Sequence, residues 1–267
     1  MDHNNLTDLE FEQFRKFIYD KAGISLSSAK KPLVWGRLNK RLLIHSCTSF
    51  HEYFKLIHSE QHADELQLAI DLLTTNETFF FREQEHFEYL GREILAKEHF
   101  PHFSLWSAAC STGEEPYSLA MTLSEYLGVS GWNMLASDIS TRVLEKARTG
   151  LYPIERSQTI PNNYLKKYCL KGQHEYDGSF LIEKKLRDRI RFCQINLNTH
   201  LPNVGHYNVI FLRNVMIYFD FKTKQQVLER VCRALKPGGF LFVSHSESLA
   251  GLTDSLKMIR PSIYRHG

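Results

Sequence analysis

The feature that most constrains the fold is an alternation of apolar and amphipathic segments that begins after Pro101. Short apolar stretches indicate buried strands: FSLWSAA, MLASDIS, RIRFCQINL, YNVIFLRN and FLFVSHSES. Longer stretches with helical spacing lie between them: EPYSLAMTLSEYL, TRVLEKARTG and KTKQQVLERVCRAL, the last closed by PGG. This order predicts an α/β fold with a doubly wound, mostly parallel sheet, and KMIRPSIYR predicts a final antiparallel pair.

The segment ahead of this alternation is different. Residues 1–85 carry aromatic and aliphatic side chains at helical spacing, which predicts a helical N-terminal domain before a second domain at 86–267. Within the stretch DLLTTNETFFFREQEHFEYLGREIL, Thr74 and Glu77 have the spacing of a capping box. We therefore expect a helix to begin there.

One region interrupts the second domain. Residues 151–189 are polar and punctuated by proline, and Gly172 and Gly178 bracket a turn. This pattern predicts a small antiparallel β insertion on the main sheet. A long surface loop is the alternative.

Composition excludes several classes of protein. A net charge of +3 is too small to indicate nucleic-acid binding by itself. The five cysteines form no CxxC pair, and the thirteen histidines form no HExxH spacing, so we expect neither a disulfide framework nor a metal site. The start MDHNNLTD lacks a signal-peptide pattern, and no apolar run approaches the ~20 residues of a membrane span. We therefore predict a cytoplasmic protein.

Ligands of doubly wound sheets bind beyond the carboxyl ends of the strands. Residues typical of binding motifs cluster at the ends of the predicted strands: Gly113, Asp138, Asn196, Asn214 and Ser246. The loop in WSAACSTGEEPYSLAM ends in two carboxylates, Glu114 and Glu115.

Carboxylates would repel a phosphate but attract a cationic ligand, and S-adenosylmethionine is a nucleotide-like ligand with two cationic groups and no phosphate. Asp138 ends the second strand, where an acid binds ribose hydroxyls in dinucleotide sheets. The alternative is that Glu114 and Glu115 are first-turn acids favoured only by the helix dipole.

Several segments together resemble one family. In order they are TTNETFFFRE, WSAACSTGEEPYSLAM, ASDIS, NLN, FLRNVMIYFD and PGGFLFVSHSESL. They resemble the CheR family, the chemoreceptor glutamate methyltransferases of bacterial chemotaxis, from about Asp8 to the C-terminus. The resemblance implies a class I methyltransferase fold. It also implies methyl transfer from S-adenosylmethionine to glutamates of a receptor's cytoplasmic coiled coil, with S-adenosylhomocysteine as product and recruitment to membrane receptor arrays.

The resemblance also implies roles for the first half of the site. Asn76, Thr78 and Arg82 correspond to linker residues that fold over the cofactor. Glu115 corresponds to the acid that meets the methionine part, and Asp138 to the acid that binds the ribose. The linker is therefore expected to close one side of the pocket.

The second half of the implied site comes from later strands. Asn196 and Leu197 correspond to the pair beside the adenine, and Arg213 and Asn214 to the last wall of the pocket. Cys110 is a departure, since many relatives have alanine at this position. A thiol is small, so we expect the fold to be kept, with oxidation as its added chemistry.

Arg82 and Tyr218 correspond to the two residues that the family places near the transferred methyl. A glutamate nucleophile has a pKa near ~4.3 and is already ionised at neutral pH, so the reaction needs no general base. We therefore expect Arg82 to orient the carboxylate. Tyr218 is expected to donate a hydrogen bond or shape the path of the methyl group. The alternatives are a surface arginine and a core tyrosine.

The stretch between Lys21 and His51 contains no acidic residue. Four basic residues share one face of its predicted helix: Lys30, Arg37, Lys40 and Arg41. Apolar residues share the adjacent face and are expected to pack: Val34, Trp35, Leu38 and Leu42. The resemblance implies that this helix meets the receptor, and a solvated basic face is the alternative.

Other functions remain as alternatives. They are methylation of another protein or a small carboxylic acid, and a non-catalytic adaptor that senses S-adenosylmethionine.

Ser111 lies outside any GxSxG elbow, which argues against a hydrolase. We expect His245 and Ser246 to line the pocket or cap a turn. In some relatives the insertion binds a receptor's C-terminal tether, but QHEYD lacks a further glycine, so tether dependence stays open.

Overall fold

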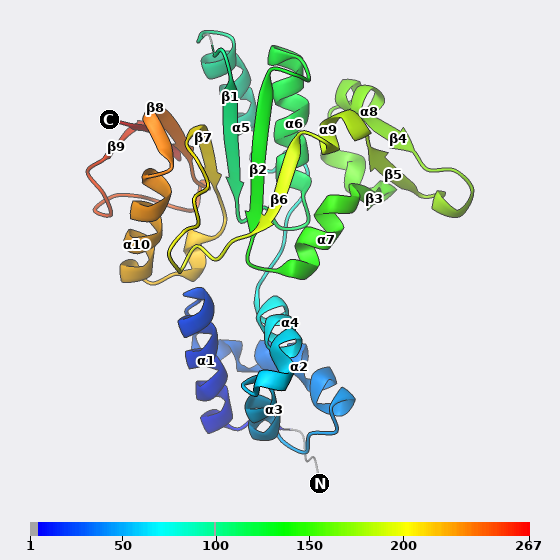
Figure 1. The fold of residues 1–267 in the computed structure, drawn as a ribbon, viewed down its shortest axis with the longest axis vertical. Helices are drawn as coiled ribbons and strands as arrows, with labels where there is room; N and C mark the ends of the chain where they lie inside the picture. The colour runs from blue at the N-terminus through cyan, green and yellow to red at the C-terminus, as the bar shows by residue number, and fades with distance from the viewer. Residues whose placement is uncertain (1–4, 99) are drawn as a thin grey trace.

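The computed structural model describes residues 5–98 and 100–267. The first four residues of the helical domain expected at 1–85 therefore lie outside the described residues. Figure 1 shows a helical part below the carboxyl ends of β1 and β2. Within the described ranges, no helix is long and apolar enough to cross a membrane.

The upper part is built on a seven-stranded sheet of order β6-β2-β1-β7-β8-β10-β9. Its strands are β1 Phe103–Ala108, β2 Trp132–Asp138, β6 Ile190–Gln194, β7 Tyr207–Leu212, β8 Leu235–Phe242, β9 Leu256–Arg260 and β10 Ile263–His266. The first five strands in this order are parallel, whereas β10 is antiparallel to both neighbours. The predicted mostly parallel sheet and its final antiparallel pair are confirmed. The PGG segment, however, lies inside β8 and does not close the preceding helix.

Helices cover both faces of this sheet. They are α5 Gln84–Tyr89, η3 Leu90–Leu95, α6 Glu114–Leu127, α7 Thr141–Thr149 and α10 Phe221–Cys232. Successive side chains of a strand point to opposite faces. Leu105 of β1 accordingly joins the apolar cluster that contains Leu119 of α6, and the next residue, Trp106, joins the cluster that contains Val227 of α10. Both faces are thus buried, as a parallel sheet requires.

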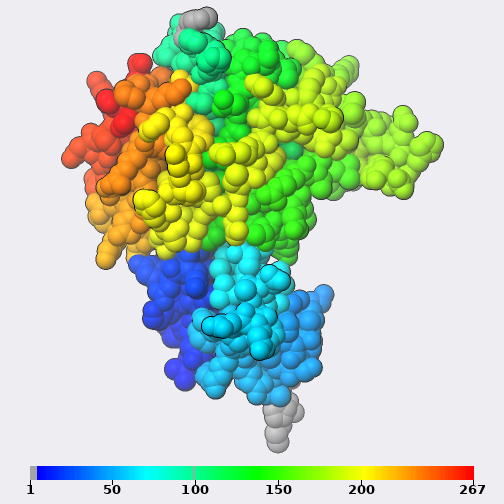
Figure 2. Space-filling view, viewed as in Figure 1, coloured from blue at the N-terminus to red at the C-terminus, as the bar shows by residue number. Residues whose placement is uncertain are grey.

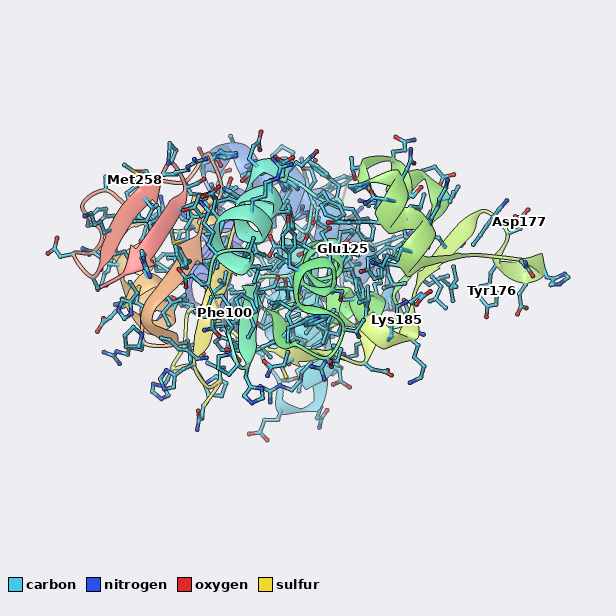
Figure 3. The ribbon with its side chains drawn as sticks, turned by 90° about the horizontal axis from the view of Figure 1, so that it is seen from above. Phe100, Glu125, Tyr176, Asp177, Lys185 and Met258 are labelled. Carbon is cyan, nitrogen blue, oxygen red and sulfur yellow. The ribbon has the colours of Figure 1, made fainter. Side chains whose placement is uncertain are left out.

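The insertion forms a second, smaller sheet. Its elements are β3 Leu151–Pro153, η4 Ile154–Thr159, α8 Asn162–Tyr168, β4 Cys169–Lys171, η5 His174–Tyr176, β5 Ser179–Ile182 and α9 Lys184–Arg187. The strands are antiparallel in the order β3-β5-β4, which confirms the predicted β insertion. In Figure 3 the β4–β5 hairpin projects away from the main sheet, with Tyr176 and Asp177 near its tip.

The N-terminal helices are α1 Asp8–Ala22, α2 Lys31–Ile44, α3 Phe50–Ile57 and α4 Ala63–Leu73, with short 3-10 turns η1 Ser28–Lys30 and η2 Glu60–His62. The expected helix start at Thr74 and Glu77 is wrong. Thr74 follows the last residue of α4, and its hydroxyl donates to the carbonyl of Asp71 at 2.9 Å. Arg37 of α2 donates to the carbonyls of Leu73 and Thr74 at 3.0 and 2.9 Å. These bonds satisfy helix-end carbonyls, so the chain leaves α4 extended.

Hydrogen bonds of side chains and backbone join the helical part to the sheet part. The amide of Asn196 donates to the carbonyl of Lys21 at 2.6 Å, and the backbone N–H of Ser25 donates to the carbonyl of Tyr218 at 2.8 Å. Asp71 of α4 accepts from the backbone N–H groups of Thr141 and Arg142 at the start of α7. Figure 2 shows the resulting contact between the two parts.

We expect Asp71→Ala to lower the free energy of unfolding by about 1–2 kcal/mol, because it removes the carboxylate that caps α7 from another helix. Asp71 is only 2% exposed, so water has little access to the N–H groups that would lose their acceptor. Urea denaturation of the full chain measures the loss. Asp64→Ala, at an exposed position of the same helix, is the control and should stay within about 0.5 kcal/mol of the unsubstituted chain. Equal losses in the two variants would contradict the interdomain cap.

Candidate active site

A cavity of about 930 Å³, its mouth included, lies between the helical part and the carboxyl ends of the strands. The expected cofactor-binding and catalytic residues all line it: Asn76, Thr78, Arg82, Glu115, Asp138, Asn196, Leu197, Arg213, Asn214 and Tyr218. The structure therefore brings together residues that are far apart in the sequence.

The loop between β1 and α6 forms one wall of this cavity. Gly113 has φ +98°, and a Cβ atom there would lie 2.7 Å from the hydroxyl of Tyr152 and 2.9 Å from Cβ of Ala147. Glycine is thus required both by the backbone and by the close approach of the insertion. Cys110 lines the cavity but is buried, and burial raises the pKa of its thiol. A thiol with a raised pKa is a poor nucleophile, so the structure gives no support to oxidation at this position.

Asp138 is held at the end of β2 by backbone donors. Its Oδ2 accepts from the N–H of Ser111 at 2.9 Å and its Oδ1 from the N–H of Ser140 at 3.0 Å. Burial raises the pKa of Asp138, because its ionised form has lost water. Each carboxylate oxygen keeps a free lone pair, so a diol in the cavity has acceptors to bind.

The two adjacent glutamates do not act as a pair. Glu115 lines the cavity, whereas Glu114 is 1% exposed and lies against the insertion. Glu114 accepts from the hydroxyl of Thr112 at 2.6 Å and lies 3.6 Å from the guanidinium of Arg156. Neighbouring residues on a helix point about 100° apart, so one carboxylate faces the ligand space and the other does not. Only Glu115 is consistent with the role expected for carboxylates at this turn.

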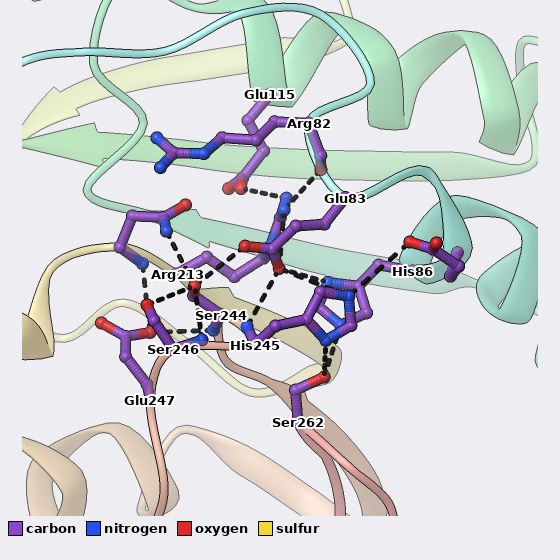
Figure 4. A network of polar contacts seen from close by, with 12 residues as sticks. Arg82, Glu83, His86, Glu115, Arg213, Ser244, His245, Ser246, Glu247 and Ser262 are labelled. Atoms are coloured by element: carbon purple, nitrogen blue, oxygen red, sulfur yellow. Dashed lines mark hydrogen bonds and ion pairs between the residues drawn. The ribbon is translucent and has the colours of Figure 1, made fainter.

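A buried arginine connects Glu115 to a residue that the sequence analysis missed. The guanidinium of Arg213, 1% exposed, donates to Glu115 at 2.9 Å, to the carbonyl of Arg82, and contacts Glu83 at 3.2 Å (Figure 4). Burial raises the pKa of Glu115. Burial alone would raise the pKa of Glu83 too, but Arg213 and the hydroxyl of Ser244 hold it below its usual range. The ionised carboxylate of Glu83 therefore holds Arg213 in position next to Glu115.

The far end of the cavity is more apolar. Leu197 and Ile195 are largely buried there and Ile139 is half-buried. The two isoleucines were not expected from the sequence. The side chain of Asn196 already serves the domain junction, because its oxygen accepts from the N–H of Asn198 and its amide binds Lys21. A flat aromatic ligand would thus contact aliphatic side chains beside Asn196.

Arg82 and Tyr218 reach the cavity from different elements. Arg82 belongs to the extended segment after α4, where its guanidinium donates to the carbonyl of Glu77 at 3.0 Å and lies 5.6 Å from the ring centre of Phe79. Tyr218 ends the short helix η6 Met216–Tyr218. Both side chains line the same space as Glu115.

The segment SHSE forms a turn after β8. The backbone N–H of Ser244 donates to the carboxylate of Glu247 at 2.8 Å, and that of Ser246 donates to the hydroxyl of Ser244 at 3.3 Å. Neither His245 nor Ser246 is among the residues that line the cavity. Of the two roles expected for them, the turn is confirmed and the pocket lining is wrong.

The basic helix α2 has fewer free charges than expected. Arg37 is occupied by the end of α4, and Arg41 donates to both carboxylate oxygens of Glu65 at 2.8 and 2.5 Å. Lys40 is exposed, as is Lys30 immediately before the helix. Trp35 is less buried than expected, with 39% of its surface exposed. The helix surface is therefore a mixed basic and aromatic one.

The doubly wound sheet, the glycine turn and the acid that ends the second strand fit an S-adenosylmethionine-dependent methyltransferase. Comparison with known families agrees. Residues 76–264 match the family model "CheR methyltransferase, SAM binding domain", and residues 9–74 match "CheR methyltransferase, all-alpha domain". The chain belongs to the CheR methyltransferase family.

Curated relatives are similar over nearly their whole length. The chain is 40% identical over 262 residues to the chemotaxis protein methyltransferase of Escherichia coli, covering 97% of this chain and 91% of that protein. It is 41% identical over 261 residues to chemotaxis protein methyltransferase 2 of Pseudomonas aeruginosa, covering 96% and 92%. Both parts of the chain are thus shared with these relatives.

Proposed function

We propose that this chain transfers a methyl group from S-adenosylmethionine to glutamate side chains of chemoreceptors and forms glutamyl methyl esters. The observation that supports the proposal is that one cavity is lined by all four of these residues: Arg82, Tyr218, Glu115 and Asp138. The names of the relatives, chemotaxis protein methyltransferases, support the class of substrate.

The residues present fit S-adenosylmethionine. Asp138 would accept hydrogen bonds from the ribose hydroxyls, and Glu115 would pair with the ammonium of the methionine part. Burial has made the ionised forms of both acids costly, and a cationic ligand with hydroxyl donors offsets that cost. Leu197 and Ile195 would contact the adenine. We assign Asn76 and Thr78 to the segment that covers the ligand, and Arg213 and Asn214 to the opposite wall.

Bound S-adenosylmethionine supplies an electrophilic methyl group, and the protein's task is to place a carboxylate in line with it. Arg82 would orient that carboxylate through its two parallel N–H groups, and Tyr218 would donate a hydrogen bond or shape the approach. The extended segment that carries Arg82 would exclude water from a reaction in which charge is neutralised. An arginine that bound the carboxylate too tightly would slow the step by stabilising the ground state. No residue is required as a general base.

The exposed side chains of α2 and its start are the proposed receptor surface. Lys30 and Lys40 would present positive charge to an acidic coiled coil. The exposed part of Trp35, on the same helix as Lys40, would add apolar contact area. Arg37 and Arg41, expected to bind the receptor directly, would instead hold the helix in place through their internal bonds.

Charge reversal tests this surface. The double variant Lys30→Glu/Lys40→Glu should raise KM for a receptor cytoplasmic fragment about 3- to 10-fold, with kcat unchanged, because edge charges act mainly on association. The effect should shrink at high salt. The control, Lys222→Glu/Lys257→Glu, has the same net charge and exposed positions on the other domain. A control that matches the double variant would show that only net charge matters.

We also propose that the protein is cytoplasmic and is recruited to membrane receptor arrays. Strand β4 lies at an edge of the small sheet, so its free main-chain groups are open to pairing with an extended peptide such as a receptor tether. Binding of a tether peptide to the chain, measured by calorimetry, tests this extension.

Formation of S-adenosylhomocysteine tests the proposed activity against its alternatives. We expect turnover with a receptor cytoplasmic fragment and none with a control protein or small carboxylic acids. Receptor binding without turnover would favour the adaptor, and turnover with small acids alone would favour a different substrate.

A further inference from the structure

A second cluster of polar side chains lies behind Arg213, outside the cavity. Glu83 and His86 are one turn apart at the start of α5, and His245 follows β8 (Figure 4). Nδ1 of His86 lies 3.4 Å and Nε2 of His245 lies 4.0 Å from Oε2 of Glu83. The two imidazole rings are 4.7 Å apart. Glu83 is thus faced by one nitrogen from each ring.

Ser262 contacts one nitrogen of each imidazole ring. Its hydroxyl donates to the carbonyl of Pro261 at 2.5 Å, so its oxygen is left as an acceptor. Nε2 of His86 lies 2.7 Å and Nδ1 of His245 lies 3.1 Å from this oxygen. A hydroxyl has two lone pairs, so both nitrogens can donate to it. In that arrangement Nδ1 of His86 and Nε2 of His245 are unprotonated in the neutral rings.

In that tautomer the lone pair of Nδ1 of His86 faces Oε2 of Glu83, which is also contacted by the guanidinium of Arg213 and the backbone N–H of His245. A cation between the imidazole nitrogen and the carboxylate would remove the repulsion between their lone pairs. The side chain of His86 is 1% exposed, and its Nδ1 has no hydrogen-bond partner within the described residues. A fully buried imidazole nitrogen without a partner is rare, and a bound ion is one of the partners that such a nitrogen takes.

We propose that Glu83, His86 and His245 bind a divalent transition-metal ion of the zinc type. Two imidazoles and one carboxylate are a usual zinc ligand set, with the fourth position open. Glu85, whose carboxylate lies 3.6 Å from Nε2 of His245, is exposed and within reach of that position. Zinc ligands at ~2.0–2.2 Å lie roughly 3.3–3.5 Å apart. The three ligand atoms here lie within 4.8 Å of one another, so His245 must approach the other two ligands. It is 48% exposed and has room to move.

The surroundings suit such a site. Ser262 would bind the outer nitrogens of both histidines and fix their orientation, and Ser244 donates to Oε1 of Glu83 at 2.8 Å. Oε2 also accepts from the backbone N–H of His245 at 3.2 Å and contacts Arg213 at 3.2 Å. The ion would fix the start of α5 to the end of β8 and hold Glu83 against Arg213. The absence of a metal site was expected from local sequence spacing, which does not reveal this cluster because His245 lies 162 positions after Glu83.

The test is a metal titration of the full chain after treatment with a chelator. Calorimetry with Zn²⁺ measures stoichiometry and affinity, and Co²⁺ reports imidazole and carboxylate ligation through its absorption spectrum. We expect a saturable site that also raises Tm, and no comparable binding of Mg²⁺, which prefers oxygen ligands.

Variants locate the site. His245→Ala should remove one zinc equivalent and the Co²⁺ spectrum. Ser262→Ala, which leaves the ligands in place, should weaken affinity about 10- to 100-fold. The control is His206→Ala, an exposed histidine immediately before β7, and should behave as the unsubstituted chain. Unchanged stoichiometry and affinity in His245→Ala, or no zinc binding by the unsubstituted chain, would overturn the proposal.

Discussion

Arg82→Ala is expected to lower kcat for methyl transfer about 10²- to 10³-fold, the loss typical when one oriented donor is removed from a reacting group. The proposed role of Arg82 is to hold a carboxylate in line with the methyl group, so the variant should lose orientation more than binding. Arg82→Lys keeps the charge but not the two parallel N–H groups. Its kcat should therefore lie between those of Arg82→Ala and the unsubstituted chain. Initial-rate measurements with a receptor fragment give kcat and KM.

The cofactor must be assayed separately, because Arg82 also lines its cavity. Calorimetry with S-adenosylmethionine should show a change in affinity much smaller than the change in kcat. Arg142→Ala, an exposed arginine at the start of α7, is the control for net charge and should keep full activity. An unchanged rate in Arg82→Ala would remove the residue from the reaction.

Arg213→Met is expected to lower the free energy of unfolding by about 3–5 kcal/mol, because it leaves the buried carboxylates of Glu83 and Glu115 without their counterion. Affinity for S-adenosylmethionine should also fall, since Glu115 loses the partner that orients it. Urea denaturation measures the first effect and calorimetry the second.

Two further variants separate the causes. Arg233→Met removes an exposed ion pair with Glu229 and should change stability by less than about 1 kcal/mol. Adding Glu115→Gln to Arg213→Met removes one of the uncompensated charges and should recover part of the lost stability. A loss in Arg213→Met no larger than in Arg233→Met would contradict the buried network.

Much of the fold follows from local patterns. Strand residues such as Leu105 and Trp106 alternate between two buried faces, and the polar residues at the strand ends meet because parallel strands share one carboxyl edge. Asp138 could therefore be placed from sequence. The role of Arg82 was implied only by resemblance, and it stays a prediction.

The errors arose where distant partners override local preference. Thr74 and Glu77 have capping spacing, but Arg37 binds the carbonyls that end α4 and the chain continues extended. Arg41 was expected on a free basic face, but its partner Glu65 comes from another helix.

The sites found only in three dimensions have the same origin. Glu83 was passed over because its partners Arg213 and His245 are far along the chain. A local scan for acid–histidine spacing finds Glu83 and His86, but it does not find the third side chain. The position of the domain boundary, expected at residue 85, also stays a prediction.

The most direct test of the central claim is the chemical bond that is formed. The full chain is incubated with methyl-labelled S-adenosylmethionine and a receptor cytoplasmic fragment, and the labelled fragment is treated with mild base. The account predicts that label enters the receptor fragment, not a control protein, and is released as methanol, as a carboxyl methyl ester requires. Label that stays on the receptor after base treatment, or no label despite bound cofactor, would contradict glutamate methylation.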